Sequence, residues 1–381
     1  MHIELTSDQR DLRAELRGYF AGLISPEERH ALMRERHGEV YRRIVRRMGS
    51  DGWLGVGWPH EYGGRGFGDI EQHIFVDEAA RADVQLPSVT LQTVGPTLQE
   101  FGTEEQKKLF LPRILAGEVH FAIGYTEPDA GTDLASLRTT AVRDGDSYVV
   151  NGQKIFTTGG HDADYIWLAV RTDPDAPKHR GISILILDTS DPGYSWTPII
   201  TCDGAHHVNA TYYSDVRVPA NMLVGKENQG WKLITTQLNH ERVMLGPAGR
   251  IGGLYDRVHA WAEARNLLDE PDVRRVLRET HATVRINELL NWQVAVTHPV
   301  DVADASATKI FGSERIQRIG RMLGEIVARH GDLTDPETAA LAEWLDVLAR
   351  RNLVLTFGGG VNEIQRELIA MMGLGLPRVP R

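Results

Sequence analysis

The first segment of the chain has the hydrophobic spacing of an amphipathic helix. Thr6-Ser-Asp-Gln9 has the spacing of a capping box, and apolar residues then recur at helical intervals from Leu12 to Leu23. The same pattern continues to about residue 120, interrupted at residues 58–68 (WPHEYGGRGFG), whose proline and glycines do not continue a helix. We therefore predict an N-terminal helical domain over residues 1–120.

The pattern changes to short β-rich runs between about residues 121 and 225. Runs such as YIWLAV at 165–170 and ISILIL at 182–187 are rich in β-branched residues. Asp144-Gly145 and Asn151-Gly152 are dipeptides that tolerate the positive φ angles of tight hairpins. We predict a β domain over residues 121–225, built as an antiparallel sheet or barrel.

Helical spacing returns at Trp231 and persists to the end of the chain. The last long helical pattern runs from about Pro336 to Leu355, and the glycines Gly358 to Gly360 should end it because they make a poor helix interior. We predict a C-terminal helical bundle over residues 226–381. The fold class is then α+β, with a β domain between two helical ones.

Composition and charge restrict the class of protein. A chain of 381 residues can form two or three packed units, and a net charge of -10 argues against a large nucleic-acid surface. No stretch approaches the roughly 20 apolar residues of a membrane span, and the N-terminus lacks the apolar core of a signal peptide. We expect a cytoplasmic protein that binds neither nucleic acid nor a membrane.

Metal and disulfide chemistry find little support in the sequence. The single Cys202 excludes an intramolecular disulfide, and His206 and His207 lack ligand spacing, so we predict no metal site. A basic run, Arg42, Arg43, Arg46 and Arg47, is interpreted as the solvated face of a helix.

The segment GYTEPDAGTDL at residues 124–134 is the first candidate binding element. Gly131 allows the backbone to approach a ligand closely, and Thr126 and Thr132 offer hydroxyl groups. Such a loop could hold a polar, planar ligand. On its own it fits a capped turn equally well.

The segment NGQKIFTTGG at residues 151–160 is the second candidate. It places the ring of Phe156 beside the hydroxyls of Thr157 and Thr158 at the end of a predicted strand. A ring that stacks and a hydroxyl that donates are what the face and edge of a flavin require. On its own this segment fits an ordinary strand end equally well.

Together and in this order, the two segments resemble the acyl-CoA dehydrogenase family. The resemblance also includes the GWPHEYGGRG connector, Ser214-Asp-Val-Arg-Val-Pro219 and the terminal EIQR, and so covers nearly the whole chain. It implies a helical domain, a β domain and a C-terminal four-helix domain. FAD would lie between the β domain and the C-terminal helices.

The resemblance also implies roles for single residues. Tyr125 and Thr126 match positions that contact the isoalloxazine, and Thr132 matches a hydroxyl near flavin and substrate. Phe156 stands where many members have a flavin-stacking Trp, which keeps the stacking surface without the indole N–H. Thr158 matches a threonine that approaches the reactive nitrogen of the flavin.

The family's reaction requires a base. The base removes the pro-R α-proton of an acyl-CoA thioester while the β-hydrogen leaves as hydride to FAD, and the product is the enoyl-CoA. Developing enolate charge must be met by preorganised donors. A carboxylate in a dry site has a pKa raised toward neutrality and is a competent base. In many members this base is a Glu shortly before the terminal motif, and Gly359 takes that place here.

Two carboxylates remain as candidates. Glu363 matches a position at the adenosine end of the cofactor, so it is expected to face FAD together with Asn362, while Gly359 leaves close backbone approach. Glu241 is the better candidate. Some members, including those that act on branched or bulky acyl chains, carry the base on this earlier helix.

The neighbours of Glu241 fit this interpretation. Arg242 matches an arginine common in the family, and His240 is expected to line or hydrogen-bond the substrate pocket. The competing interpretation is that Glu241 pairs with a neighbouring cation on a helix surface, the commoner fate of a helical Glu.

The chain departs from the family at the segments that bind the pyrophosphate and adenosine of a neighbouring subunit's FAD. Residues 262–271 lack Arg-x-x-Phe-Gly, and residues 322–331 lack Gln-x-x-Gly-Gly-x-Gly. A buried pyrophosphate without Arg or N–H donors would be costly. Bacterial enzymes that shorten steroid side chains resemble this chain closely, including its GGGVNEIQR ending, and many of them are α2β2 heterotetramers.

We therefore expect the base-bearing subunit of a heterotetramer. Its partners would be an acyl-CoA substrate with a bulky steroid side chain, a second acyl-CoA dehydrogenase-like subunit and an electron-transfer flavoprotein-like acceptor. The alternatives are an acyl-CoA oxidase of the same architecture, a silent subunit that completes a partner's site, and a non-enzymatic acyl-CoA binder.

Overall fold

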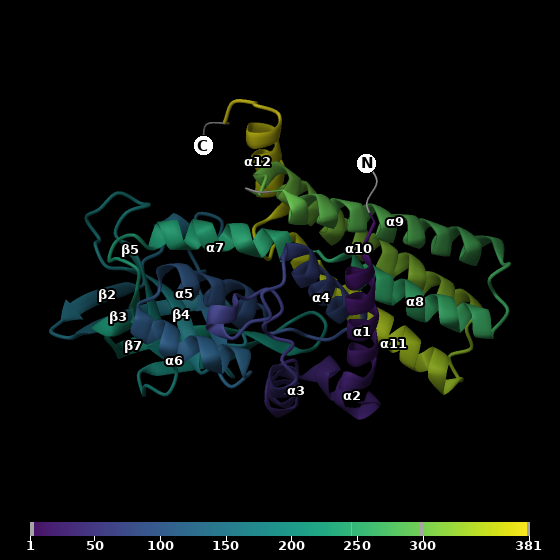
Figure 1. Cartoon of the computed structure of the whole chain (residues 1–381), viewed down its shortest axis with the longest axis horizontal. Helices are drawn as coiled ribbons and strands as arrows, with labels where there is room; N and C mark the ends of the chain where they lie inside the picture. Colours follow the sequence, from purple (N-terminus) through teal and green to yellow (C-terminus); the bar gives the residue numbers. More distant parts are fainter. Residues whose placement is uncertain (1–3, 245, 298–299, 379–381) are drawn as a thin grey trace. The chain divides into compact units, whose positions relative to one another are not determined.

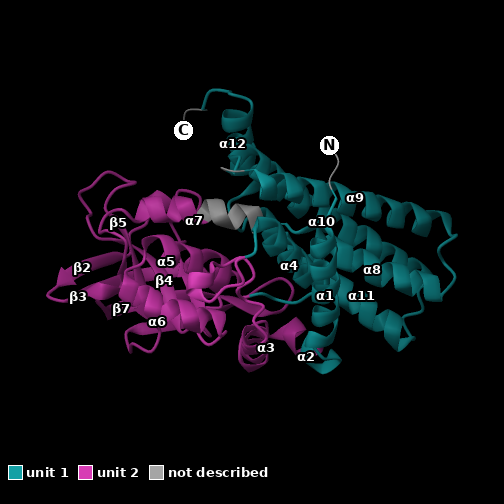
Figure 2. Ribbon diagram, viewed as in Figure 1, with its two compact units in different colours: residues 1–29, 67–86, 242–381 teal, residues 30–66, 87–241 magenta. Residues whose placement is uncertain are grey.

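The computed structural model describes residues 4–244, 246–297 and 300–378, without the side chains of residues 238–244. Its contacts divide the chain into two units (Figure 2). Unit 1 comprises Met1–Arg29, Phe67–Leu86 and Arg242–Arg381, and unit 2 comprises His30–Gly66 and Pro87–Glu241. Both units therefore draw on the N-terminal third of the chain. The predicted domain boundaries at 120 and 225 stay predictions.

Unit 1 is helical. The α-helices that lie wholly within unit 1 are α1 (Ser7–Leu23), α4 (Asp69–Arg81), α8 (Ala248–Ala264), α9 (Pro271–Val296), α10 (Val302–His330), α11 (Pro336–Arg351) and α12 (Asn362–Leu368). The predicted capping box is confirmed at the start of α1, where the Thr6 hydroxyl accepts the Gln9 N–H at 3.2 Å. None of the described helices has an apolar stretch long enough to cross a bilayer.

The long helices of unit 1 lie side by side as a bundle (Figure 1). α10 packs against α8, α9 and α11, and its apolar stripe is buried. Asp301 and Asp335 cap α10 and α11 by accepting backbone N–H groups. α11 ends at Arg351, four residues before the predicted end, because residues Asn352–Thr356 tighten into a 3-10 turn.

Unit 2 combines helices with one mixed sheet. Its helices are α3 (Glu39–Ser50), α5 (Gly95–Phe101), α6 (Glu104–Leu115) and the part of α7 (Gly230–Met244) that precedes residue 242. Helix α2 (Pro26–Arg34) is divided between the units, because the first segment of unit 1 ends at residue 29. The strands are β1 (Phe121–Gly124), β2 (Thr140–Asp144), β3 (Ser147–Thr158), β4 (Tyr165–Arg171), β5 (Ile182–Asp188), β6 (Tyr194–Ile200), β7 (His206–Pro219) and β8 (Leu223–Val224).

The sheet confirms the predicted fold class and corrects its detail. The strand order is β6-β7-β3-β2-β4-β5-β8, and neighbours are antiparallel except where β2 meets β4. β1 pairs with β4 in parallel, so the sheet is not antiparallel throughout. A core of apolar side chains from several strands, with Tyr148 and Ile166 fully buried, fixes this arrangement.

One of the two predicted hairpin turns is wrong. Gly145, with φ +60°, joins β2 to β3 as expected. Gly152 instead lies inside β3, at an irregularity where β7 carries an extra residue. A Cβ on Gly152 would lie 2.6 Å from the Thr139 hydroxyl, so the glycine permits a close crossing and not a turn.

The predicted solvated face of α3 is wrong at Arg42. Helix α3 buries Tyr41 and Ile44. Arg42, next to Tyr41, contacts two carboxylates of the β region. Its Nε lies 2.9 Å from Asp162 Oδ1, and its Nη1 lies 3.3 Å from Asp164 Oδ1. Local charge density could not reveal partners 120 residues away.

Candidate active site

The two candidate binding segments lie against each other in unit 2. The Ile155 N–H of β3 donates to the Thr126 carbonyl at 2.8 Å, and Lys154 Nζ donates to the Tyr125 carbonyl at 3.1 Å. The sequence separates these segments by more than twenty residues. The structure therefore joins the predicted flavin-contacting loop to the predicted flavin-stacking strand.

A buried ion pair that sequence reasoning missed supports this junction. Lys154 Nζ lies 2.7 Å from Glu127 Oε1, and the Lys154 residue is 1% exposed. The other Glu127 oxygen accepts the Arg138 N–H at 2.7 Å, and Oε1 accepts the Thr139 N–H at 2.8 Å. The loop is thus closed on both sides by one carboxylate. In the sequence, this ion pair was indicated only by the presence of a Glu in the first motif and a Lys in the second.

The pKa values of the pair follow from burial and mutual attraction. Burial lowers the pKa of Lys154 to about 8, against the opposing effect of Glu127. Burial also acts to raise the pKa of Glu127, but the Lys154 charge and the Thr139 hydrogen bonds outweigh it and hold this pKa below its usual value. Both groups are charged at neutral pH.

Phe156 has a backbone conformation that bulky residues rarely adopt. Its φ is +58°, and the residue is 59% exposed, whereas its neighbour Thr157 and Lys154 on the same strand are buried. It lies in a bulge, because β3 uses one residue more than β7 between the pairs Lys154–Thr211 and Thr157–Asn209. Strain of this kind concentrates at functional sites.

The hydroxyls beside Phe156 differ in direction. Thr157 is buried and shares a 3.1 Å hydrogen bond with the Thr211 hydroxyl, so it belongs to the sheet interior. Thr158 is partly exposed, and Thr132 is exposed. A Cβ on Gly131 would meet only the Thr126 methyl group, at 3.8 Å, which leaves open space at the loop.

The Tyr125 side chain is buried within unit 2. Its hydroxyl is buried, donates to Gln237 Oε1 of α7 and accepts from Trp167 Nε1 at 3.1 Å. The contact of Tyr125 with a flavin stays a prediction. Gln237 and Trp167 had no signal in the sequence beyond their place on apolar runs.

The proposed base lies on the same helix as Gln237. Glu241, with His240 and Arg242, belongs to the last turns of α7. Their side chains lie outside the described residues. Their roles stay predictions.

The glycine segment belongs to unit 1. Gly359 and Gly360 have φ angles of +69° and +94°, which explains why glycine stands there. Lys309 Nζ donates to the Gly360 carbonyl and to Asn362 Oδ1, both at 2.7 Å. The Asn362 amide is buried and bonds within unit 1, whereas Glu363 is exposed. Cofactor contacts at Gly359, Asn362 and Glu363 stay predictions.

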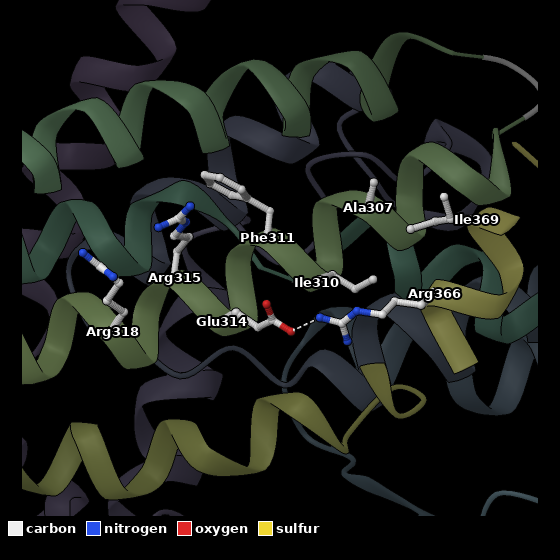
Figure 3. A pocket seen from close by; sticks show the side chains of 8 residues that line it. All are labelled: Ala307, Ile310, Phe311, Glu314, Arg315, Arg318, Arg366 and Ile369. Carbon is white, nitrogen blue, oxygen red and sulfur yellow. Dashed lines mark hydrogen bonds and ion pairs between the residues drawn. The ribbon is translucent and has the colours of Figure 1, made fainter. Parts of the chain in front are cut away.

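A groove of about 600 Å³ lies on α10 and the C-terminal segment of unit 1 (Figure 3). Its lining comprises Ala307, Ile310, Phe311, Glu314, Arg315, Arg318, Arg366 and Ile369. The ion pair between Glu314 and Arg366, 2.5 Å long, crosses it. Among the predicted site residues whose side chains the structure describes, none lines this groove.

Several histidines lie close to one another in unit 2. His37 Nε2 lies 3.1 Å from His207 Nδ1, and His206 Nε2 lies 2.7 Å from Asn209 Oδ1. Burial, reinforced by His207, lowers the pKa of His37 to about 2. Among the residues that the structure describes, no three His, Cys, Asp or Glu side chains are placed to hold a metal ion.

Family models match three consecutive parts of the chain. The acyl-CoA dehydrogenase N-terminal domain matches residues 6–118, the middle domain residues 122–216 and the C-terminal domain residues 228–374. The chain belongs to the acyl-CoA dehydrogenase family. The predicted family, fold class and enzyme class are thereby confirmed.

Relatives of this acyl-CoA dehydrogenase match over its full length. "Acyl-CoA dehydrogenase FadE29" of Mycobacterium tuberculosis is 68% identical, and the match covers 100% of both chains. A chain of a structure described as "Tcur3481-Tcur3483 steroid ACAD" is 50% identical with a TM-score of 0.94, and a chain of the ChsE4-ChsE5 complex from M. tuberculosis is 49% identical with a TM-score of 0.91. Each match covers 100% of both chains.

Proposed function

We propose that this acyl-CoA dehydrogenase uses FAD to convert a steroid side-chain acyl-CoA thioester to its trans-2-enoyl-CoA. Glu241 is the base for the α-proton. FAD supplies the acceptor for the β-hydride. Membership in the family supports the reaction class. The choice of FAD as cofactor, of Glu241 as base and of a steroid thioester as substrate is part of the proposal and goes beyond family membership.

The observation that carries the proposal is Phe156. The exposed ring loses the stabilisation that burial would give, and the left-handed φ angle strains the backbone. A planar cofactor stacked on the ring explains both features. Thr158, the open loop at Gly131 and the exposed Thr132 lie on segments joined directly to it, so the described residues of unit 2 fit one edge and one face of a flavin.

The proton step assigns roles to the chain's own residues. An α-carbon next to a thioester is a weak acid, so the base must be held close and in a site without bulk water. Glu241 takes the α-proton from the face opposite the hydride acceptor. Gly359, at the family's alternative base position, has no group that titrates. His240 and Arg242 would border the acyl chain beside the base.

Two neighbours support the substrate and the assembly. One is described as a steroid ACAD and the other as a complex of two proteins, and each matches this chain over its full length at about half identity. We extend both features to this chain: a bulky steroid acyl group, and an α2β2 assembly with a second acyl-CoA dehydrogenase-like subunit. An electron-transfer flavoprotein-like protein would reoxidise the enzyme.

The test combines assembly with substrate range. The chain is purified alone and together with the product of an adjoining dehydrogenase-like gene, and each preparation is mixed anaerobically with steroid side-chain and straight-chain acyl-CoA thioesters. We expect stoichiometric FAD only in the complex, and flavin bleaching with enoyl-CoA formation fastest for the steroid thioester. Full FAD and activity in the isolated chain would reject the assembly. Stoichiometric hydrogen peroxide in air would identify an oxidase, and the absence of flavin from both preparations would reject the reaction.

A further inference from the structure

Three buried polar side chains from separate elements of unit 2 meet at one point. Trp167 of β4 donates its Nε1–H both to the Tyr125 hydroxyl and to Gln237 Oε1, each at 3.1 Å, and the Tyr125 hydroxyl donates to the same Gln237 oxygen. Gln237 is 1% exposed. The triad links the end of β1, the centre of β4 and the helix α7.

The chemistry of the triad fixes the orientation of the Gln237 amide. An indole N–H can only donate, so the atom facing Trp167 must be the amide oxygen. The Nε2 group is then buried, with no hydrogen-bond partner among the described residues. An unpaired buried donor is costly, and an apolar side chain of the same shape would avoid that cost. Stability alone therefore does not explain a glutamine here.

The position of Gln237 on α7 does explain it. Leu233 and Ile234 of α7 are also buried, and apolar packing, which has no preferred direction, tolerates small shifts along and around the helix axis. Hydrogen bonds to Tyr125 and Trp167 tolerate such shifts poorly because their strength depends on distance and angle. Gln237 thus gives α7 a directional link to Tyr125 and Trp167.

Glu241 follows Gln237 by four positions, one turn later on the same helix. Tyr125 is followed directly by Thr126, whose carbonyl holds the strand that carries Phe156. The geometry points to Gln237 as a positioning residue that fixes the base-bearing turn of α7 relative to the loop that holds the cofactor. This inference rests on the proposed role of Glu241.

The expected signature is a loss of rate without a loss of cofactor. A displacement of the base by about 1 Å lowers the rate by roughly 100-fold. In the assembled holoenzyme, we expect Gln237→Leu to lower kcat roughly 10- to 100-fold while KM and FAD content stay within about threefold of the wild type. The α-deuterium isotope effect on flavin reduction should rise, because proton abstraction becomes slower relative to other steps.

Two further variants separate positioning from structure. Gln237→Glu keeps an acceptor oxygen for Tyr125 and Trp167 and should recover most of the rate. Thr235→Val removes a hydroxyl of the same helix whose hydrogen-bond partners among the described residues are the carbonyls of Trp231 and Lys232, so it should leave the rate unchanged.

Glu241→Gln completes the set and distinguishes the two ways of failing. If Glu241→Gln retains the wild-type rate, the proposed function fails. If Glu241→Gln is inactive but Gln237→Leu keeps the wild-type kcat and isotope effect, the positioning role alone is overturned. A Gln237→Leu complex that loses rate only in proportion to its FAD also overturns it. If Gln237→Leu does not fold, Gln237→Met takes its place with the same outcomes.

Discussion

The ion pair between Lys154 and Glu127 makes the sharpest prediction about stability. At an effective dielectric constant of about 20, unit charges 2.7 Å apart attract by roughly 6 kcal/mol, and burial offsets part of this. Glu127→Gln keeps the shape and one acceptor oxygen but leaves the buried Lys154 ammonium without a counter-charge. We expect it to lower the free energy of unfolding by about 3 to 5 kcal/mol.

A double-mutant cycle measures this coupling. Lys154→Met should also destabilise, because it removes the ammonium group that pairs with the Glu127 carboxylate and leaves the Arg138 and Thr139 N–H groups as its backbone donors. The double variant Glu127→Gln/Lys154→Met removes both charges and should be less destabilised than the sum by about 2 kcal/mol or more. Urea denaturation of the four proteins at pH 7 gives the coupling energy. Single variants that each cost less than 1 kcal/mol, or strictly additive effects, would refute the reasoning.

Three further predictions follow from backbone strain and burial. Phe156→Gly should relieve left-handed strain of about 1 to 2 kcal/mol while weakening FAD binding roughly tenfold, and a melting curve with a flavin titration checks both; unchanged affinity would argue against stacking. Gly360→Ala should cost more than about 1 kcal/mol because φ is +94°, whereas Gly358→Ala, whose φ is not left-handed, should cost less; equal denaturation midpoints would contradict this. Burial, and to a smaller extent the charge of Arg42, lowers the pKa of His120 to about 4. As the pH falls below about 6.5, His120 is therefore protonated in the unfolded chain before it is protonated in the folded protein. The wild type should therefore lose stability between pH 7 and pH 5, by about 2 kcal/mol from this group. His120→Gln should flatten that dependence in urea titrations, and an unchanged slope would refute the assignment.

Local sequence patterns predicted the elements whose cause is local. The capping box at Thr6, the strand runs at 165–170 and 182–187, and the non-helical glycines after α11 all follow from residues within a few positions of one another. The same dipeptide logic failed at Asn151-Gly152. There the glycine answers the close approach of Thr139, which pairing of distant strands creates.

The candidate site divides in the same way. The two motifs could be recognised from their residue types, and the structure joins them through Thr126 and Ile155. The supports could not be recognised. Glu127 and Lys154 are 27 positions apart, and Gln237 is 112 positions from Tyr125, so only folding brings these pairs together. Arg42 is the same case at the surface of α3, where its partners lie on a distant turn.

The role of Glu241 as the base can be tested by the kinetics of flavin reduction. The assembled complex, as wild type and as Glu241→Gln, is mixed anaerobically with a steroid side-chain acyl-CoA thioester, and the loss of flavin absorbance is followed in a stopped-flow instrument. We predict rapid bleaching of the wild type and a rate lower by roughly a thousandfold in Glu241→Gln, with unchanged FAD content and thioester binding. Bleaching of Glu241→Gln at the wild-type rate would contradict the account.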